Sequence, residues 1–215
     1  MIDIEVFSDV VCPWCLIGKR NLEAAIKQFD SFNSEKIDVK IEWRAFQLNP
    51  QLPKDGILRN EYTSTKFGGK EQAKIIYERI TSAGQSVGLD MKFNRISTQP
   101  NSALMHGMIY AAKTRAKENA LIEAFFESFF MLGIDLTKTR NIEEVCLRAG
   151  IETDLVKSVT NDGKFLDRVE EDLFKAQQLG IQGVPFFIIN KTIGLSGAQP
   201  PEVIAQAMSR SLQHE

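Results

Sequence analysis

Apolar and polar residues alternate at the start of the chain. Ile2, Ile4 and Val6 are separated by Asp3 and Glu5. A period of two is typical of a strand with one buried face. The same alternation returns over residues 38–45, before the Pro residues at 50 and 53. The pattern therefore predicts two strands in the first quarter of the chain.

The segment between these two strands has helical spacing instead. Leu16, Leu22, Ala25, Ile26 and Phe29 recur at intervals of three and four, with charged residues between them. A proline stands at position 13, and the first turn of a helix tolerates proline because its backbone N–H has no partner there. The first part of the chain therefore reads as strand–helix–strand.

A long helical block follows, from about residue 58 to residue 179. It contains no run of residues with convincing strand character. Asn141 with Glu144 resembles a helix N-cap and its partner three residues on. The spacing predicts helices over 70–86, over 102–117, through Phe125, Phe126, Phe129 and Phe130 as far as Gly133, from Asn141 to Gly150, and over 163–179.

Strand character resumes near the end of the chain. Residues 186–189 form a short apolar run, residues 192–195 suit its hairpin partner, and an amphipathic helix follows Pro201. This element order predicts an α/β fold with a large all-helical insertion. We expect residues 1–53 and 180–215 to form one discontinuous domain and residues 54–179 to form the insertion domain.

Composition and charge exclude several classes of protein. The 215 residues are 43% hydrophobic, and 26 Lys and Arg stand against 28 Asp and Glu. This balance lacks the basic character of a nucleic-acid binder, and no apolar run approaches the ~18 residues of a membrane span. The first residues have no basic start or apolar core of a secretory signal. We therefore expect a cytoplasmic protein with no nucleic-acid or membrane partner.

Cys12-Pro13-Trp14-Cys15 is the sharpest chemical feature of the sequence. Two sulfurs at this spacing can form a disulfide across one helical turn, and the first lies at the helix N-terminus, where the dipole stabilises a thiolate. Cys12 is then the attacking thiol, and Cys15, which is less exposed, resolves the mixed disulfide. A zinc site needs four ligands, and only Cys146 and two histidines remain, so we expect no metal.

A second feature is the proline at the start of the later strand, in Gly183-Val184-Pro185-Phe186. Proline lacks a ladder donor, so it marks a strand edge or a special peptide bond. Periodicity alone leaves the isomer of this bond open.

Together these features resemble the thioredoxin superfamily and, more narrowly, the DsbA family in its FrnE-like branch of thiol–disulfide oxidoreductases. The matching segments are distributed over nearly the whole chain. They are Asp9-Val10-Val11-Cys12-Pro13-Trp14-Cys15 with Ile17-Gly18-Lys19-Arg20, Phe46-Gln47-Leu48-Asn49-Pro50, Gly180-Ile181-Gln182-Gly183-Val184-Pro185-Phe186-Phe187, and Ser196-Gly197-Ala198-Gln199-Pro200.

The resemblance implies that Val184-Pro185 is a cis bond lying against Cys12 and Cys15. It implies that Val184 pairs through its backbone with the substrate chain, that Pro185 shapes the site, and that protein or small-molecule thiols and disulfides are the substrates. Glutathione is a candidate co-substrate, and no metal or nucleotide cofactor is implied.

One residue departs from the best-known oxidising members of the family, which place His between the cysteines. Here Pro13 and Trp14 occupy those positions, and we expect them to contact the substrate. Trp14 brings no charge, so we expect a less oxidising couple.

Other residues have weaker signals. Asp9 either tunes proton transfer at Cys15 or caps the local backbone, and His106 either lines a substrate groove or is a structural residue of its helix. Cys146 and the four phenylalanines have the spacing of core residues.

Two alternatives to the oxidoreductase remain open. One is a glutathione-dependent isomerase or transferase of the kappa and hydroxychromene carboxylate isomerase type. The other is a non-catalytic holdase that binds polypeptides. Retention of both cysteines argues against the first.

Overall fold

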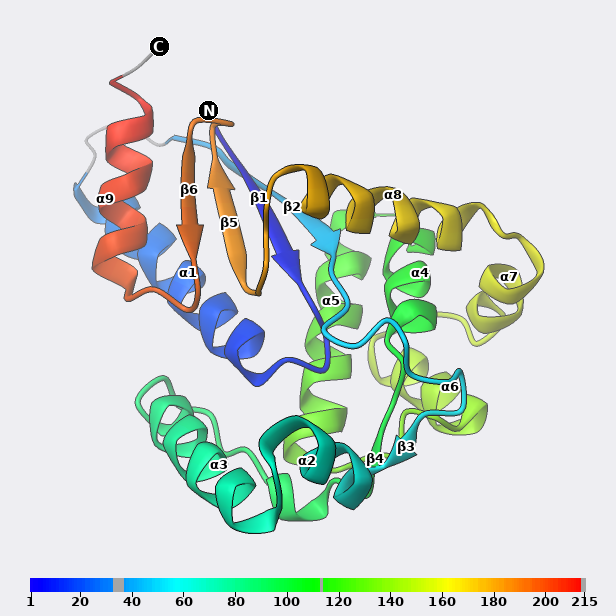
Figure 1. Ribbon diagram of the computed structural model, residues 1–215. Helices are drawn as coiled ribbons and strands as arrows, with labels where there is room; N and C mark the ends of the chain where they lie inside the picture. The colour runs from blue at the N-terminus through cyan, green and yellow to red at the C-terminus, as the bar shows by residue number, and fades with distance from the viewer. Residues whose placement is uncertain (33–36, 113, 214–215) are drawn as a thin grey trace. The chain divides into compact units, whose positions relative to one another are not determined.

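The computed structural model describes residues 1–32, 37–112 and 114–213. The chain divides into two compact units, one of residues 1–48 with 172–215 and one of residues 49–171 (Figure 1). The second boundary falls inside helix α8 (Lys164–Gln178). The thioredoxin-like unit is therefore discontinuous in sequence.

A four-stranded mixed sheet forms the centre of the first unit. Its order is β2-β1-β5-β6, with β1 (Ile2–Ser8), β2 (Val39–Ala45), β5 (Phe186–Ile189) and β6 (Ile193–Ser196). β1 pairs in parallel with β2 and antiparallel with β5, and β5 pairs antiparallel with β6. Alternation predicted β1 and β2, and the apolar run 186–189 with its hairpin partner at 192–195 predicted β5 and β6; the structure confirms all four strands, with β6 one residue later than expected.

Helices α1 (Pro13–Phe32) and α9 (Pro201–Ser211) pack side by side along this sheet (Figure 1). Along β1, Ile2, Ile4 and Val6 share one face and are buried. Side chains alternate along a strand, so Phe7 points to the opposite face, where it forms a buried cluster with residues of α8 and the segment after it. Both faces of β1 thus contribute to the core near its C-terminal end.

The second unit is mainly helical. The helices in its described residues are α2 (Arg59–Phe67), α3 (Lys70–Gln85), α4 (Ala103–Ala111), α5 (Arg115–Phe126), α6 (Thr139–Arg148), α7 (Leu155–Asn161) and the first half of α8. Helix α5 continues into a π-helical turn, Glu127–Met131. The four phenylalanines of this region are all 0% exposed, which confirms that they are core residues. A pair of two-residue strands, β3 (Ile57–Leu58) and β4 (Thr98–Gln99), also occurs here. The pattern predicted no strand in this block, because two residues are too few to show an alternation.

Two predicted helices differ from those observed. The helix expected over 102–117 is in fact two helices, and the Thr114 hydroxyl caps the second by accepting from the Lys117 N–H at 3.3 Å. The helix expected to start at Asn141 begins at Thr139, so Asn141 is not its N-cap. Asn141 lies within the first turn of this helix, and its side-chain amide donates to the Asp135 carbonyl at 2.8 Å.

Candidate active site

The loop after β1 places the two cysteines at the start of α1. The Cys12 N–H donates to the Asp9 carbonyl at 2.9 Å, which closes a turn, and α1 begins at Pro13. The Cys15 N–H then donates to the Cys12 carbonyl at 3.1 Å. Cys12 therefore directly precedes the positive end of the helix, as its position in the sequence predicts.

Both thiols are free and buried. Cys12 is 3% exposed and Cys15 is 1% exposed, so the expected difference in exposure is small. Burial raises the pKa of Cys15 well above its ordinary value, and the neighbouring Cys12 adds to this, while an N–H donated by Asp9 at 3.5 Å acts in the opposite direction. Cys15 is therefore held as a neutral thiol beside Cys12.

The second predicted motif lies against the first. The Val184–Pro185 bond is cis, and the Cys12 thiol approaches the Val184 carbonyl at 3.6 Å. The Pro185 carbonyl accepts from the Gly197 N–H at 2.8 Å. A Cβ placed on Gly18 of α1 would come within 2.7 Å of Pro185 Cγ, so glycine at this position permits the close approach of helix and proline. The cis-proline segment and the cysteine motif, which are far apart in sequence, thus meet at Cys12 Sγ.

Asp9 organises the loop that carries the cysteines. Its side chain is fully buried, and its two carboxylate oxygens accept from the Val11 N–H at 3.2 Å and the Leu48 N–H at 2.8 Å. Its backbone contacts both Cys12 and Cys15, as given above. These contacts fit the structural alternative for Asp9, which the sequence analysis left open, and they explain why the segment 46–50 accompanies the cysteine motif.

Asn21 connects α1 to the loop that follows β6. Its side-chain amide donates to the Gln199 carbonyl at 2.9 Å. This loop also holds Gly197, the donor to Pro185. Sequence reasoning did not single out Asn21, although its neighbourhood in the motif 17–20 was the available signal.

The remaining predicted residues are placed as follows. Pro13 and Trp14 are half-buried at the start of α1. His106 is buried in α4 of the second unit, and its role at the sulfurs stays a prediction. Cys146 is fully buried in α6, where burial raises its pKa to about 11, as expected of a core thiol. Among the described residues, no group of three or more His, Cys, Asp or Glu is arranged to hold a metal ion.

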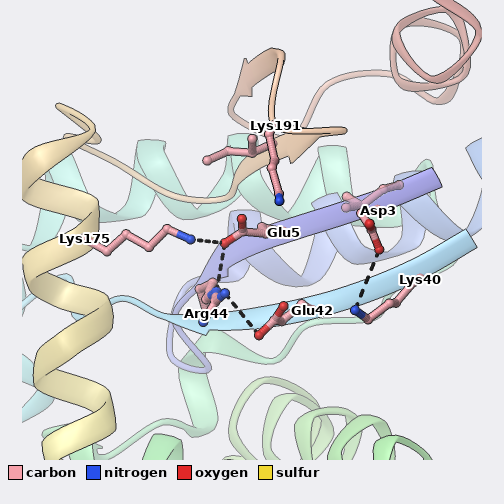
Figure 2. Close-up of a pocket in the computed structure, with 9 residues that line it drawn as sticks. Asp3, Glu5, Lys40, Glu42, Arg44, Lys175 and Lys191 are labelled. Atoms are coloured by element: carbon pink, nitrogen blue, oxygen red, sulfur yellow. Dashed lines mark hydrogen bonds and ion pairs between the residues drawn. The ribbon is translucent and has the colours of Figure 1, made fainter. Parts of the chain in front are cut away.

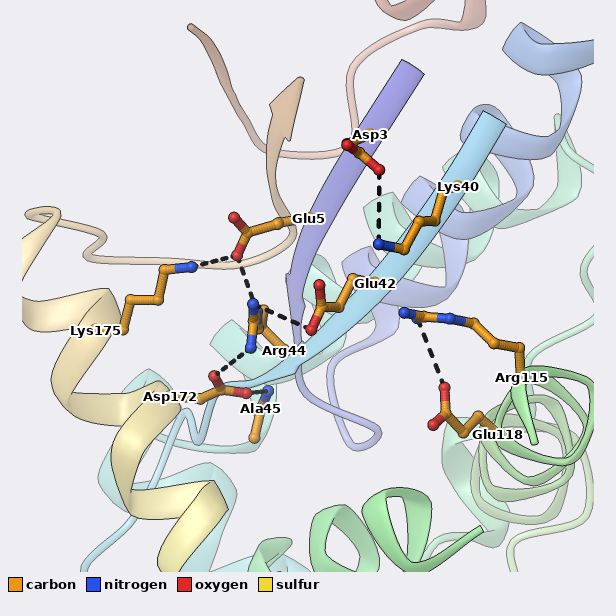
Figure 3. A network of polar contacts seen from close by, with 10 residues as sticks. All are labelled: Asp3, Glu5, Lys40, Glu42, Arg44, Ala45, Arg115, Glu118, Asp172 and Lys175. Carbon is orange, nitrogen blue, oxygen red and sulfur yellow. Dashed lines mark hydrogen bonds and ion pairs between the residues drawn. The ribbon is translucent and has the colours of Figure 1, made fainter. Parts of the chain in front are cut away.

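A charged hollow of about 350 Å³ lies elsewhere in the first unit, over β1 and β2 (Figure 2). Glu5 of β1 and Arg44 of β2 meet at its base at 2.9 Å, and Lys175 of α8 also contacts Glu5. Arg44 further contacts Glu42 at 3.1 Å and Asp172 at 3.3 Å (Figure 3). These opposite charges neutralise one another, so the network attaches α8 to the sheet.

The family model for the DSBA-like thioredoxin domain matches residues 3–209. The YwbO protein of Bacillus subtilis (strain 168), itself named as uncharacterized, is 25% identical over 209 residues, which are 97% of this chain and 96% of YwbO. The probable DsbA oxidoreductase SCO1869 of Streptomyces coelicolor is 29% identical with a TM-score of 0.89, and the match covers 100% of this chain and 92% of SCO1869.

More distant solved structures share the fold. A 2-hydroxychromene-2-carboxylate isomerase is 14% identical with a TM-score of 0.71, over 99% of this chain and 97% of the other. The cytosolic disulfide reductase DsbM of Pseudomonas aeruginosa is 14% identical with a TM-score of 0.66, over 99% and 100% of the two chains. Within the described ranges, no helix combines the length and apolar character that a membrane crossing requires.

Proposed function

The chain belongs to the DSBA-like thioredoxin domain family, whose model spans residues 3–209, and on this basis we propose that Cys12 and Cys15 exchange disulfides with thiol substrates. The enzyme class is thiol–disulfide oxidoreductase.

The observation that carries the proposal is the contact between the two motifs. Cys12 Sγ lies 3.6 Å from the Val184 carbonyl and directly precedes the N-terminus of α1. A thiolate at that position is stabilised by the helix dipole, and the backbone at Val184 is next to the reacting sulfur. A substrate chain that pairs with this backbone as an added strand would present its own sulfur to Cys12.

In the reductive direction the cycle has two exchanges. The Cys12 thiolate attacks one sulfur of the substrate disulfide, forming a mixed disulfide and releasing the other substrate sulfur as a thiolate. Cys15 then loses its proton and attacks Cys12 Sγ, which forms Cys12–Cys15 and releases the second substrate thiolate. An external thiol, such as glutathione, supplies the two electrons that restore the dithiol. The oxidative direction is the reverse of these steps.

The burial of Cys15 supports this division of roles. Because its pKa is raised well above the ordinary value, Cys15 stays protonated while Cys12 meets the substrate. Asp9 then acts as a positioning residue, since it bonds to the loop and to Cys15 without being the attacking group. We assign substrate contacts to Pro13, Trp14, Val184 and Pro185.

We further propose that the enzyme works in the cytoplasm as a reductase or isomerase of the FrnE-like type, with no metal or nucleotide. The name of DsbM as a cytosolic disulfide reductase, also solved with GSH, favours this location and this electron donor. A glutathione poise below about −220 mV keeps most cytosolic thiols reduced, which agrees with reductive work.

The test is the redox equilibrium of Cys12 and Cys15 in glutathione buffers of graded ratio. Trp14 lies between the cysteines in sequence, so its fluorescence should follow disulfide formation. We expect one reversible two-electron transition, and a midpoint nearer about −270 mV than about −120 mV for a reductase. No transition, or the same response in Cys12→Ser, would refute the dithiol mechanism.

Two variants separate the alternatives. Cys15→Ser should accumulate a mixed disulfide at Cys12 that mass spectrometry detects, and it should lose turnover with a disulfide substrate. A glutathione-dependent isomerase would instead retain activity in Cys15→Ser. A holdase would suppress aggregation equally well in Cys12→Ser. Asp9→Asn, which keeps one of the two acceptors, should shift the midpoint while leaving the Cys12 mixed disulfide able to form.

A further inference from the structure

A second hollow lies within the helical unit, far along the chain from the cysteines. Its volume is about 690 Å³, and every residue that lines it belongs to the segment 59–96. The walls come from α2, from α3 and from the turn that contains Phe93. Pockets of about 300–1,000 Å³ are the usual size for small organic ligands.

One wall of this hollow is aromatic and apolar. Tyr77 of α3 stacks on Phe93 with ring centroids 4.5 Å apart and an interplanar angle of 11°. Ala73, Met91 and Ile96 also line the space and are buried. Such a surface suits a flat apolar group rather than a hydrated inorganic ion.

The other wall contains Arg59, which is half-buried. Its guanidinium donates to the Tyr77 hydroxyl at 2.6 Å and to the side-chain carbonyl of Gln99. It also lies over the rings of Tyr62 and Tyr77, at 5.0 and 5.2 Å from their centroids. The Nε atom is buried and has no hydrogen-bond partner. Among the described residues, all the groups that contact this cation are neutral.

Buried arginines are ordinarily paired with a carboxylate, because an isolated charge is costly to remove from water. Burial accordingly lowers the pKa of Arg59. Lys70 and Lys74 line the same hollow, and Glu78 is the one carboxylate among its described lining residues. Glu78 lies 4.0 Å from Lys74, and among the described residues it forms no ion pair with Arg59. The hollow therefore has an excess of positive charge beside an apolar wall.

We propose that this hollow binds an aromatic carboxylate, whose anionic group pairs with Arg59 and whose ring lies against the apolar wall with Tyr77 and Phe93. Guanidinium has five N–H donors in a planar fork, and two of them are used by Gln99 and Tyr77. The carboxylate supplies the opposite charge that the chain does not place there, and the apolar wall selects a flat organic body. The site is independent of the proposed disulfide exchange, because neither cysteine takes part.

The test compares two ligands of the same shape and different charge. Isothermal titration calorimetry measures the affinity of the full chain for 2-naphthoate and for the neutral 2-naphthalenemethanol. We expect one naphthoate per chain and at least tenfold weaker binding of the alcohol. Arg59→Gln, checked for folding by circular dichroism, should weaken naphthoate at least tenfold and leave the alcohol unchanged. Equal affinity of acid and alcohol, or an unchanged affinity in folded Arg59→Gln, would overturn the proposal.

A second set of variants covers the case in which Arg59→Gln does not fold. Lys70→Gln with Lys74→Gln changes two exposed side chains of the same hollow and should weaken naphthoate several-fold. Lys157→Gln, an exposed lysine of α7 outside the hollow, is the matched control and should leave affinity unchanged. If the double variant and Lys157→Gln bound naphthoate with equal affinity, the proposal would be overturned. Displacement of naphthoate by an equimolar amount of inorganic phosphate would also overturn it.

Discussion

Two arginines of the molecule are partly buried among different kinds of partner, charged at one and neutral at the other. Arg44, in the thioredoxin-like unit, contacts the carboxylates of Glu5, Glu42 and Asp172, and Figure 3 shows these groups converging on its guanidinium. Arg59, in the helical unit, contacts tyrosine rings, a tyrosine hydroxyl and an amide.

The pKa directions express this difference. Burial acts to lower the pKa of both residues, but at Arg44 the neighbouring carboxylates outweigh it, and the pKa is raised. At Arg59 burial prevails and the pKa is lowered. The charge of a guanidinium surrounded by carboxylates is compensated within the fold. The charge of a guanidinium with neutral partners is not, so it can pair with a ligand.

The largest effect is expected from Arg44→Met. This change removes the guanidinium from the buried Asp172, which also accepts from the Ala45 N–H at 2.9 Å, and it removes a partner of Glu5. Breaking a buried ion pair costs about 3–5 kcal/mol, and the partial exposure of Arg44 reduces this to about 2–4 kcal/mol. Urea unfolding followed by circular dichroism measures the loss.

Lys40→Gln is the matched control for this first prediction. Lys40 lies 3.8 Å from Asp3 in the same hollow, and both side chains are about half exposed. Its removal should change the free energy of unfolding by about 0–0.5 kcal/mol. If Arg44→Met cost no more than Lys40→Gln, the network would be a surface feature and the contrast with Arg59 would disappear.

A smaller loss is expected from Arg59→Gln in the absence of ligand. The variant gives up two hydrogen bonds and the contacts with two rings, but it also removes a buried charge that no carboxylate balances. These terms oppose each other, so we expect the free energy of unfolding to fall by about 1 kcal/mol or less. A loss as large as that of Arg44→Met would mean that Arg59 is as structural as Arg44.

The last prediction concerns Tyr77, and it is a dependence of stability on pH that appears only in alkaline solution. Burial raises the pKa of Tyr77 to about 12, although Arg59 acts to lower it. The unfolded chain releases this proton near pH 10, before the folded chain does, so stability due to neutral Tyr77 is complete below about pH 10 and is lost between about pH 10 and 12. Tyr77→Phe should flatten the fall in unfolding free energy across that window.

Absorbance titration provides the direct check on this prediction. The chain has three tyrosines, and one of them should ionise about two pH units after an ordinary tyrosine. The late step should be missing in Tyr77→Phe. A tyrosine that ionises near pH 10 at this position would give Arg59 an anionic partner from the chain itself and would weaken the comparison.

Local patterns were sufficient to predict the framework of the fold. Alternation predicted β1 and β2, and the position of Pro13 predicted where α1 begins. Cys12 and Cys15 were recognised because their chemistry depends on a spacing of three, which is readable from sequence alone. The cis geometry of Val184–Pro185 came from the family resemblance, since no periodicity reports it.

Features set by contacts between distant residues were not predictable in this way. The break after α4 depends on a cap at Thr114 within an otherwise helical pattern, and the true start of α6 depends on how Asn141 meets the preceding turn. Asp9 was singled out, but its bond to Leu48 requires the β2 end to be folded against it. Arg59, Tyr77 and Gln99 are separated by more than a helical turn, so nothing in their spacing signals that they meet.

The discontinuity of the first unit has a consequence for synthesis on the ribosome. β1 receives β2 as a neighbour early, but its other edge pairs with β5, whose residues follow the whole of residues 46–185. At a synthesis rate of about 5–20 residues per second, this edge of β1 stays unpaired for roughly 7–28 seconds. An unpaired apolar strand edge invites association with other nascent chains, and charged side chains are a common protection. Asp3 and Glu5, which alternate with the buried residues of β1, provide that protection until β5 emerges.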